Sequence, residues 1–334
     1  MQNPVRETTL GIIEKAKHVK INHDAIKVLA KKWIKERIKV PLWSKKMHLD
    51  SLDEEQMLTY FFILDSLNFC FWPPKKIGGQ WAEKWHVKYK REKHSGYFGL
   101  SIALKKFFEK HAEKANFFYL HKISFREFCE ILGGTGELLF LKKRWEILKD
   151  LSSFMLKKYK GKPQKFMQTA SGSLSKLVPK IQEELPGFRD MVGVGSKKIY
   201  FWKRAQILPI DIYAAFASRE EATASQGRFW QFEDLDYATA FADYKIPQIL
   251  RFWNILEYSN SLSKKVDNKL EIKAGSLEEI EIRAGTIWGV EYLKEELYKL
   301  GRRLHSFQID WILWRKSREI KIDKPHHLTK TIFY

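Results

Sequence analysis

The segment from Gly187 to Asp211 combines residue types that bind phosphate with a carboxylate that could act in catalysis. Its tripeptide Gly193-Val194-Gly195 predicts a tight turn that opens a helix, and the free amides of a first helical turn attract phosphate. Lys197, Lys198 and Lys203 follow the turn and add positive charge. The pattern predicts an anion site, although a tight turn between two core helices explains the glycines equally well.

Asp211 is the candidate for chemistry in this segment. The run resembles the hairpin of helix-hairpin-helix DNA glycosylases, in which a similar glycine turn and helix are followed by a catalytic aspartate, and Asp211 stands near that place. The resemblance implies a nucleic-acid-binding protein or a DNA glycosylase, which the net charge of +20 and the aromatic content of 14% also suit. Without the resemblance, Asp211 is a structural polar residue.

The sequence has no spacing typical of metal, dinucleotide or thiol chemistry. Ten histidines are scattered, without the short spacings by which one helix or loop presents two ligands to zinc. The glycines at 133, 134 and 136 do not follow a predicted strand and favour a helix end over a dinucleotide-binding loop. Neither Cys70 nor Cys129 has a histidine nearby in the sequence. We therefore expect neither a metal nor an organic cofactor.

Composition places the chain among packed globular proteins. Hydrophobic residues make up 44% of its 334 residues, with 18 glycines and 10 prolines, which excludes disordered and collagen-like classes. The charge of +20 indicates an anionic partner. The longest apolar stretch, residues 60–72, is interrupted by polar residues, and residues 1–20 lack the apolar core of a signal peptide. With two cysteines in the chain, we expect a cytoplasmic protein without a membrane partner.

Helical periodicity dominates the sequence and must supply the frame for these residues. Apolar residues recur at helical spacing within 26–33 and 141–155, and residues 278–300 predict a long central helix. Pro247 opens a further amphipathic helix. Capping boxes are predicted at Ser124 with Glu127 and at Ser276 with Glu279. We expect a mainly α fold with few short strands.

Longer strings carry a closer resemblance. They are LNFCFW at 67–72, KRAQIL at 203–208, FADYKIPQ at 241–248, EIRA at 281–284 and the closing HLTKTIFY at 327–334. In order along the chain, they resemble the queuosine salvage family of queuosine 5'-phosphate N-glycosylases/hydrolases. The resemblance implies a helical, helix-hairpin-helix DNA-glycosylase-like domain over residues 21–334, preceded by an extension at 1–20. It also implies hydrolysis of queuosine 5'-monophosphate, which releases queuine for reuse in tRNA modification.

Cleavage of an N-glycosidic bond passes through an oxocarbenium-like sugar, so the site needs a carboxylate at the anomeric carbon. The resemblance assigns this role to Asp243, and the helix that begins just after it favours the ionised carboxylate. An N-terminal helix residue is the structural alternative for Asp243. Asp211 is the second candidate for the catalytic carboxylate.

The remaining expected site residues concern substrate binding. Queuine is a 7-deazaguanine, so its ring position 7 cannot be protonated, and the enzyme must stabilise the leaving base elsewhere. The resemblance assigns base binding to Phe241, Asp310 and Trp311, and a ribose or base contact to His48. Some relatives carry an acidic residue where this chain has Arg315, which reverses the charge offered to the cationic cyclopentenyl arm of the substrate.

The 5'-phosphate needs cations, and we expect Lys203 to bind it, with Lys197 and Lys198 as weaker candidates. The expected partner is therefore a small nucleotide. Nucleic acid is the alternative, and the oligomeric state is open.

Overall fold

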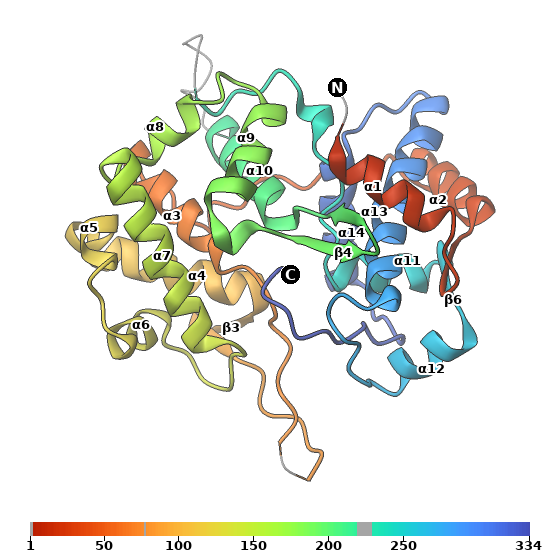
Figure 1. The fold of residues 1–334 in the computed structure, drawn as a ribbon, viewed down its shortest axis with the longest axis horizontal. Coiled ribbons are helices and arrows are strands. Elements are labelled where there is room, and N and C mark those ends of the chain that lie inside the picture. Colours follow the sequence, from red (N-terminus) through yellow and green to blue (C-terminus); the bar gives the residue numbers. More distant parts are fainter. Residues whose placement is uncertain (1–2, 77, 219–228) are drawn as a thin grey trace.

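A computed structural model describes residues 3–76, 78–218 and 229–334, which form fourteen α-helices and six short strands (Figure 1). The helices are α1 (Pro4–Ile13), α2 (His23–Lys35), α3 (Glu54–Ser66), α4 (Gly96–Lys110), α5 (Phe117–Leu120), α6 (Phe125–Leu132), α7 (Leu141–Tyr159), α8 (Pro163–Gln168), α9 (Leu174–Glu184), α10 (Lys203–Ala217), α11 (Lys245–Phe252), α12 (Asn260–Asp267), α13 (Leu277–Lys299) and α14 (Ser306–Glu319). The strands are β1 (Val19–Ile21), β2 (His86–Tyr89), β3 (Glu92–Ser95), β4 (Met191–Val194), β5 (Lys197–Tyr200) and β6 (Leu256–Tyr258). They form three separate antiparallel pairs, β1 with β6, β2 with β3, and β4 with β5. The predicted mainly α class with few short strands is confirmed.

Most of the helices that the sequence signals predict begin and end close to the expected residues. Ser124 and Glu127 form the reciprocal capping box at α6, and α6 ends at Gly133, which takes a positive φ. At α13 the box is incomplete. Ser276 accepts from the amide of Glu279, but the Glu279 carboxylate accepts from the amide of Gly275 instead.

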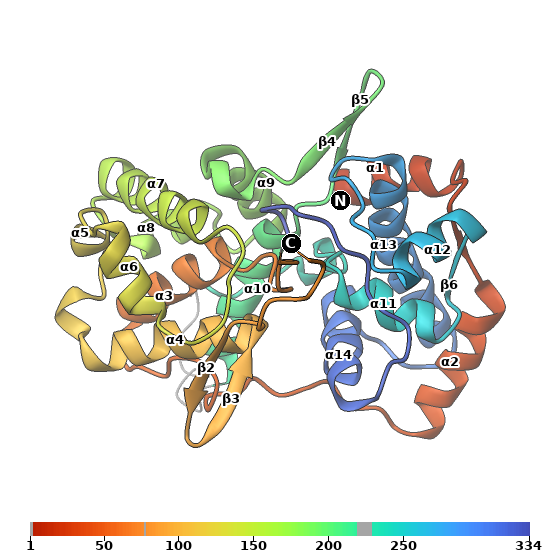
Figure 2. The same cartoon turned by 90° about the horizontal axis from the view of Figure 1, so that it is seen from below.

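The helices pack into two groups with α9 and α10 between them (Figures 1 and 2). One group contains α3 to α8, and the other contains α1, α2 and α11 to α14. Helix α10 contacts α3 and α9, and 13 of its 15 residues are buried. Its residues therefore belong to the core where the two groups meet. Within the described residues, no helix is long and apolar enough to cross a membrane.

Residues before position 20 pack onto the rest of the chain. Helix α1 lies against α13, with Val5 and Thr9 buried. Arg6 forms an ion pair of 3.1 Å with Glu291 of α13. The proposed division into an extension at 1–20 and a domain at 21–334 stays a prediction.

The glycines at 193 and 195 do not open a helix, so that prediction is wrong. Gly193 lies in β4, and Gly195, with φ 58°, begins the two-residue turn that joins β4 to β5. Valines 192 and 194 on one side and Ile199 with Tyr200 on the other favour strands, and a two-residue turn with positive φ suits a hairpin. The hairpin projects from the body of the molecule (Figure 2), and the next helix, α10, begins only at Lys203. The observation that suggested helix-hairpin-helix similarity is therefore absent.

Candidate active site

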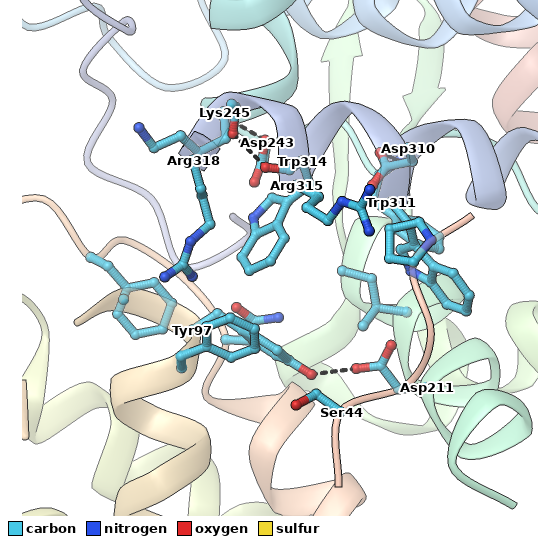
Figure 3. Close-up of a pocket in the computed structure, with 18 of the residues that line it drawn as sticks. Ser44, Tyr97, Asp211, Asp243, Lys245, Asp310, Trp311, Trp314, Arg315 and Arg318 are labelled. Atoms are coloured by element: carbon cyan, nitrogen blue, oxygen red, sulfur yellow. Dashed lines mark hydrogen bonds between the residues drawn. The ribbon is translucent and has the colours of Figure 1, made fainter. Parts of the chain in front are cut away.

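A cavity of about 960 Å³ lies where α10, α11 and α14 approach the start of α4 and the segment 39–48 (Figure 3). It contains acidic, basic and aromatic side chains in close proximity. The carboxylates are Asp211, Asp243, Asp310 and Glu319, the cations are Lys39, Lys84, Lys203, Lys245, Arg315 and Arg318, and the aromatic side chains include Trp43, Phe71, Tyr97, Phe98, Phe241, Trp311 and Trp314.

Asp243 stands at the start of α11 and is half-buried in the cavity wall. Its Oδ1 accepts hydrogen bonds from the backbone amides of Lys245, at 2.7 Å, and Ile246, at 2.9 Å. These bonds and the positive end of the helix dipole stabilise a negative charge. Oδ1 therefore acts as expected of an N-terminal helix residue, which was the structural alternative for Asp243. Among the residues that the structure describes, Oδ2 has no hydrogen-bond partner.

Asp310 of α14 lies close to Asp243 and differs from it in burial. It is only 4% exposed, and its Oδ2 accepts from the backbone amide of Phe241 at 2.9 Å. Burial, together with the charge of Asp243, raises the pKa of Asp310 well above its ordinary value. The cavity therefore holds two neighbouring carboxyl groups, one half-buried and held by two backbone amides, the other deeply buried with a raised pKa. Phe241 and Trp311 line the wall beside them.

His48, Tyr97 and Asp211 form a hydrogen-bonded chain on the opposite wall. His48 Nδ1 lies 2.9 Å from the Ser44 carbonyl, and its Nε2 lies 3.0 Å from the Tyr97 hydroxyl. That hydroxyl lies 2.7 Å from Asp211 Oδ2 (Figure 3). Burial lowers the pKa of His48 to about 4 and raises the pKa of Asp211 to about 7. Both ring nitrogens of His48 are already engaged by the protein, so the ring offers a substrate its carbon edge.

Lys203 is buried at the first position of α10 and lines the cavity. Burial lowers the pKa of Lys203, which the negative charges of Asp243, Asp65 and Asp310 partly counteract. Arg315 has its Nε 3.1 Å from Glu319 Oε1. The charge of each cation is therefore already partly balanced by carboxylates of the protein.

Lys197 and Lys198 do not share this cavity. Both are exposed on β5, in the hairpin that projects from the body, and neither lines the cavity. The structure thus separates them from Lys203, with which the sequence grouped them. The physical reason is the β turn at Gly195, since a helix there would have kept the lysines beside α10.

A buried ion pair holds two sides of the site together. Arg283 of α13 donates to both oxygens of Asp190, at 2.8 and 2.6 Å, and to the carbonyl of Ala242 at 3.1 Å. Asp190 also accepts from the backbone amide of Lys203 at 3.0 Å. One guanidinium therefore links the start of α10 to the residue before Asp243.

Sequence reasoning missed several lining residues, including Trp43, Tyr97, Lys84, Lys245 and Arg318. Of these, only Lys245 falls inside one of the strings that carry the family resemblance. The others come from separate segments, and no local pattern marks them. In the described ranges, no group of three or more histidine, cysteine, aspartate or glutamate residues could hold a metal ion.

Comparisons with known proteins cover nearly the whole chain. The family model for queuosine salvage proteins matches residues 47–334. A protein of Sphaerobacter thermophilus, named queuosine 5'-phosphate N-glycosylase/hydrolase, is 34% identical over 331 residues, or 99% of this chain and 97% of the relative. Relatives with the same name from Dictyostelium discoideum and Mus musculus are 32% and 28% identical, and each alignment covers at least 98% of both chains. The chain belongs to the queuosine salvage protein family.

Proposed function

We propose that this protein hydrolyses the N-glycosidic bond of queuosine 5'-phosphate. Water adds to C1' of the ribose, the base leaves with a proton as queuine, and ribose 5-phosphate is the second product. The relatives named above carry the name of this activity over their full length. The observation that carries the proposal in this chain is Asp243, a carboxylate held at the wall of a nucleotide-sized cavity by two backbone amides.

Asp243 stabilises the positive charge that develops on the ribose. Its Oδ1 is fixed by the first turn of α11, so Oδ2 is the oxygen available to C1'. A fixed carboxylate in a partly desolvated site stabilises an oxocarbenium ion without reorganising at the moment of reaction. It can also attack C1' itself, as in retaining glycosidases. The family resemblance and the geometry of Oδ1 support Asp243 over Asp211, which is engaged by Tyr97.

Phe241, Asp310 and Trp311 bind the base. A flat heterocycle packs on the aromatic rings, and Asp310 faces its polar edge. Burial raises the pKa of Asp310 well above its ordinary value, and a carboxyl group that carries a proton can both donate to the base and accept from it. This is a better match for a departing 7-deazaguanine than a fixed anion, because the leaving base needs a proton at one of its nitrogens.

The other expected residues take supporting roles in this proposal. His48 positions Tyr97 through Nε2 and contacts the substrate only by its ring edge. Arg315, paired with Glu319, stays the residue that replaces an acidic side chain near the cyclopentenyl arm. Lys203 is retained as a cation of the site whose charge acts on the neighbouring carboxylates. A cytoplasmic location and the absence of a cofactor stay predictions.

The test is release of queuine from queuosine 5'-phosphate, detected by mass spectrometry, with guanosine 5'-phosphate as the specificity control. Asp243→Asn keeps an oxygen for the two amides, so we expect a folded protein with kcat reduced at least about a hundredfold. Asp53→Asn is the matched control, because Asp53 accepts from two amides at the start of α3 in the same way but is exposed outside the cavity. Full activity of the Asp243 variant, or no queuine from the wild type, contradicts the proposal.

A further inference from the structure

Three cations gather along one part of the cavity. Lys84 comes from the loop before β2, Lys245 from the first turn of α11 and Arg318 from the last turn of α14. Within the described ranges, none of the three forms an ion pair. Lys245 Nζ donates to the amide oxygen of Gln248 at 3.1 Å, which is a neutral acceptor.

Arg318 is held in place by aromatic rings. Its guanidinium carbon lies 4.5 Å from the ring centre of Phe98 and 4.9 Å from that of Trp314. Such contacts fix the plane of a guanidinium while its N–H donors stay at the edge, where they can meet a phosphate oxygen. The side chain is therefore oriented at its place in the cavity before any ligand binds.

These cations repel one another. Burial, Lys245 and Arg318 together lower the pKa of Lys84. Burial lowers the pKa of Lys245, and Arg318 lowers it further although Asp243 acts in the opposite direction. Lys39, another lysine of the lining, is not among the charges that act on them. A bound anion would remove this repulsion, and a phosphate offers several acceptor oxygens at once.

The order of groups along the cavity matches the order of groups in a nucleotide. In Figure 3, Lys245 and Arg318 lie to one side of Asp243, and Asp310 and Trp311 lie to the other. A ribose at Asp243 with its base toward Asp310 and Trp311 directs its C5' toward the cations. We infer that Lys84, Lys245 and Arg318 form the subsite for the 5'-phosphate of the substrate. This inference rests on the proposed function, and it moves the phosphate away from Lys203, which is buried and lies within reach of three carboxylates, those of Asp243, Asp65 and Asp310.

The test uses Lys84→Gln, Lys245→Gln and Arg318→Gln singly. Lys245→Gln leaves the backbone amide that holds Asp243 in place. For each variant we expect KM for queuosine 5'-phosphate and Kd for ribose 5-phosphate, measured by calorimetry, to rise about tenfold or more, as loss of a charge-assisted hydrogen bond implies. kcat at saturating substrate should change less than threefold. A triple variant of the exposed lysines at 31, 106 and 142 removes the same total charge as all three cations. It controls for the effect that a lower net positive charge alone has on binding of an anion.

The outcomes separate this inference from the proposed function. If the wild type releases no queuine, the proposed function fails, and the ribose 5-phosphate titrations still decide the subsite. If the wild type is active but the three variants keep Kd and KM within twofold, the subsite is refuted. It is also refuted if Lys203→Gln, or the hairpin variant with both Lys197→Gln and Lys198→Gln, shows the phosphate-specific loss instead. Tenfold or greater effects confined to the three cations support it.

Discussion

Replacing Asp211 by asparagine should stabilise the protein in a way that grows with pH. Burial raises the pKa of the folded Asp211 to about 7 from an ordinary value of 3.8. Below pH 4 the group is protonated in both the folded and the unfolded state, so its ionisation does not affect folding. Between pH 4 and 7 the unfolded chain loses this proton and the folded chain keeps it, so the wild type is progressively destabilised. Asparagine does not titrate and escapes this loss.

The magnitude follows from the shift in pKa. Each pH unit between the two pKa values changes the free energy of unfolding by about 1.4 kcal/mol. The difference between variant and wild type should therefore grow by on the order of 4 kcal/mol from pH 4 to 7, and level off above pH 7. The groups that face Asp211 are Tyr97 of α4, Asp65 of α3, Lys203 of α10 and Asp310 of α14. Subtraction removes the contributions of groups whose titration does not depend on Asp211. The charge of Asp211 also raises the pKa of Asp65, so the loss of that charge adds to the difference with the same sign.

The measurement is urea unfolding of both proteins at pH 5, 6, 7 and 8, followed by tryptophan fluorescence. Asp53→Asn serves as the control, because it makes the same change of side chain at an exposed position outside the cavity. Tyr97→Phe adds a second check. The Tyr97 hydrogen bond lowers the pKa of Asp211. In a protein that carries Tyr97→Phe, the stability gained from Asp211→Asn should therefore level off at a higher pH. A stability difference between Asp211→Asn and the wild type that is flat from pH 5 to 8, or that shrinks with pH, would refute the reasoning.

Two further predictions concern the frame of the site. Arg283→Met should lower the free energy of unfolding by about 3–5 kcal/mol, because it leaves the carboxylate of Asp190 buried and unpaired; urea unfolding measures this, and a loss below 1 kcal/mol would contradict it. Gly136→Ala should destabilise more than Gly301→Ala, since both have positive φ but a Cβ at 136 would lie 2.7 Å from the carbonyl oxygen of Glu83, while one at 301 meets nothing within 4 Å. Equal shifts in Tm for the two alanine variants would show that this contact is relieved at no cost.

Sequence reasoning could propose those residues of the candidate site that lie within short strings. Asp243 and Phe241 fall in one string, and the hydrogen bonds that Asp243 accepts from the first amides of α11 follow from an acidic residue close before a helix. The class of fold followed from helical periodicity and from caps such as Ser124 with Glu127. These signals are local, so they can be interpreted without knowledge of the tertiary structure.

The remaining features depend on tertiary packing or on local signals that conflict. Arg318 lies more than two hundred residues after Lys84 and Tyr97 in the sequence, and only packing brings the three side chains to one cavity. At Gly193 and Gly195 the glycines suited both a helix start and a hairpin, and the flanking strand-forming side chains decided for the hairpin. That choice also determined that Lys197 and Lys198 lie away from the cavity.

The ion pair between Arg283 and Asp190 has a consequence for how the molecule melts. It joins α13, in one group of helices, to the start of α10, which packs against the other group. If one group unfolded alone, either Arg283 or Asp190 would stay buried without its partner, which costs free energy. The two groups should therefore lose structure together. Heating should then give a single heat-absorption peak whose calorimetric and van't Hoff enthalpies agree, and Asp243, next to the carbonyl that Arg283 binds, should lose its alignment at the same temperature as the core.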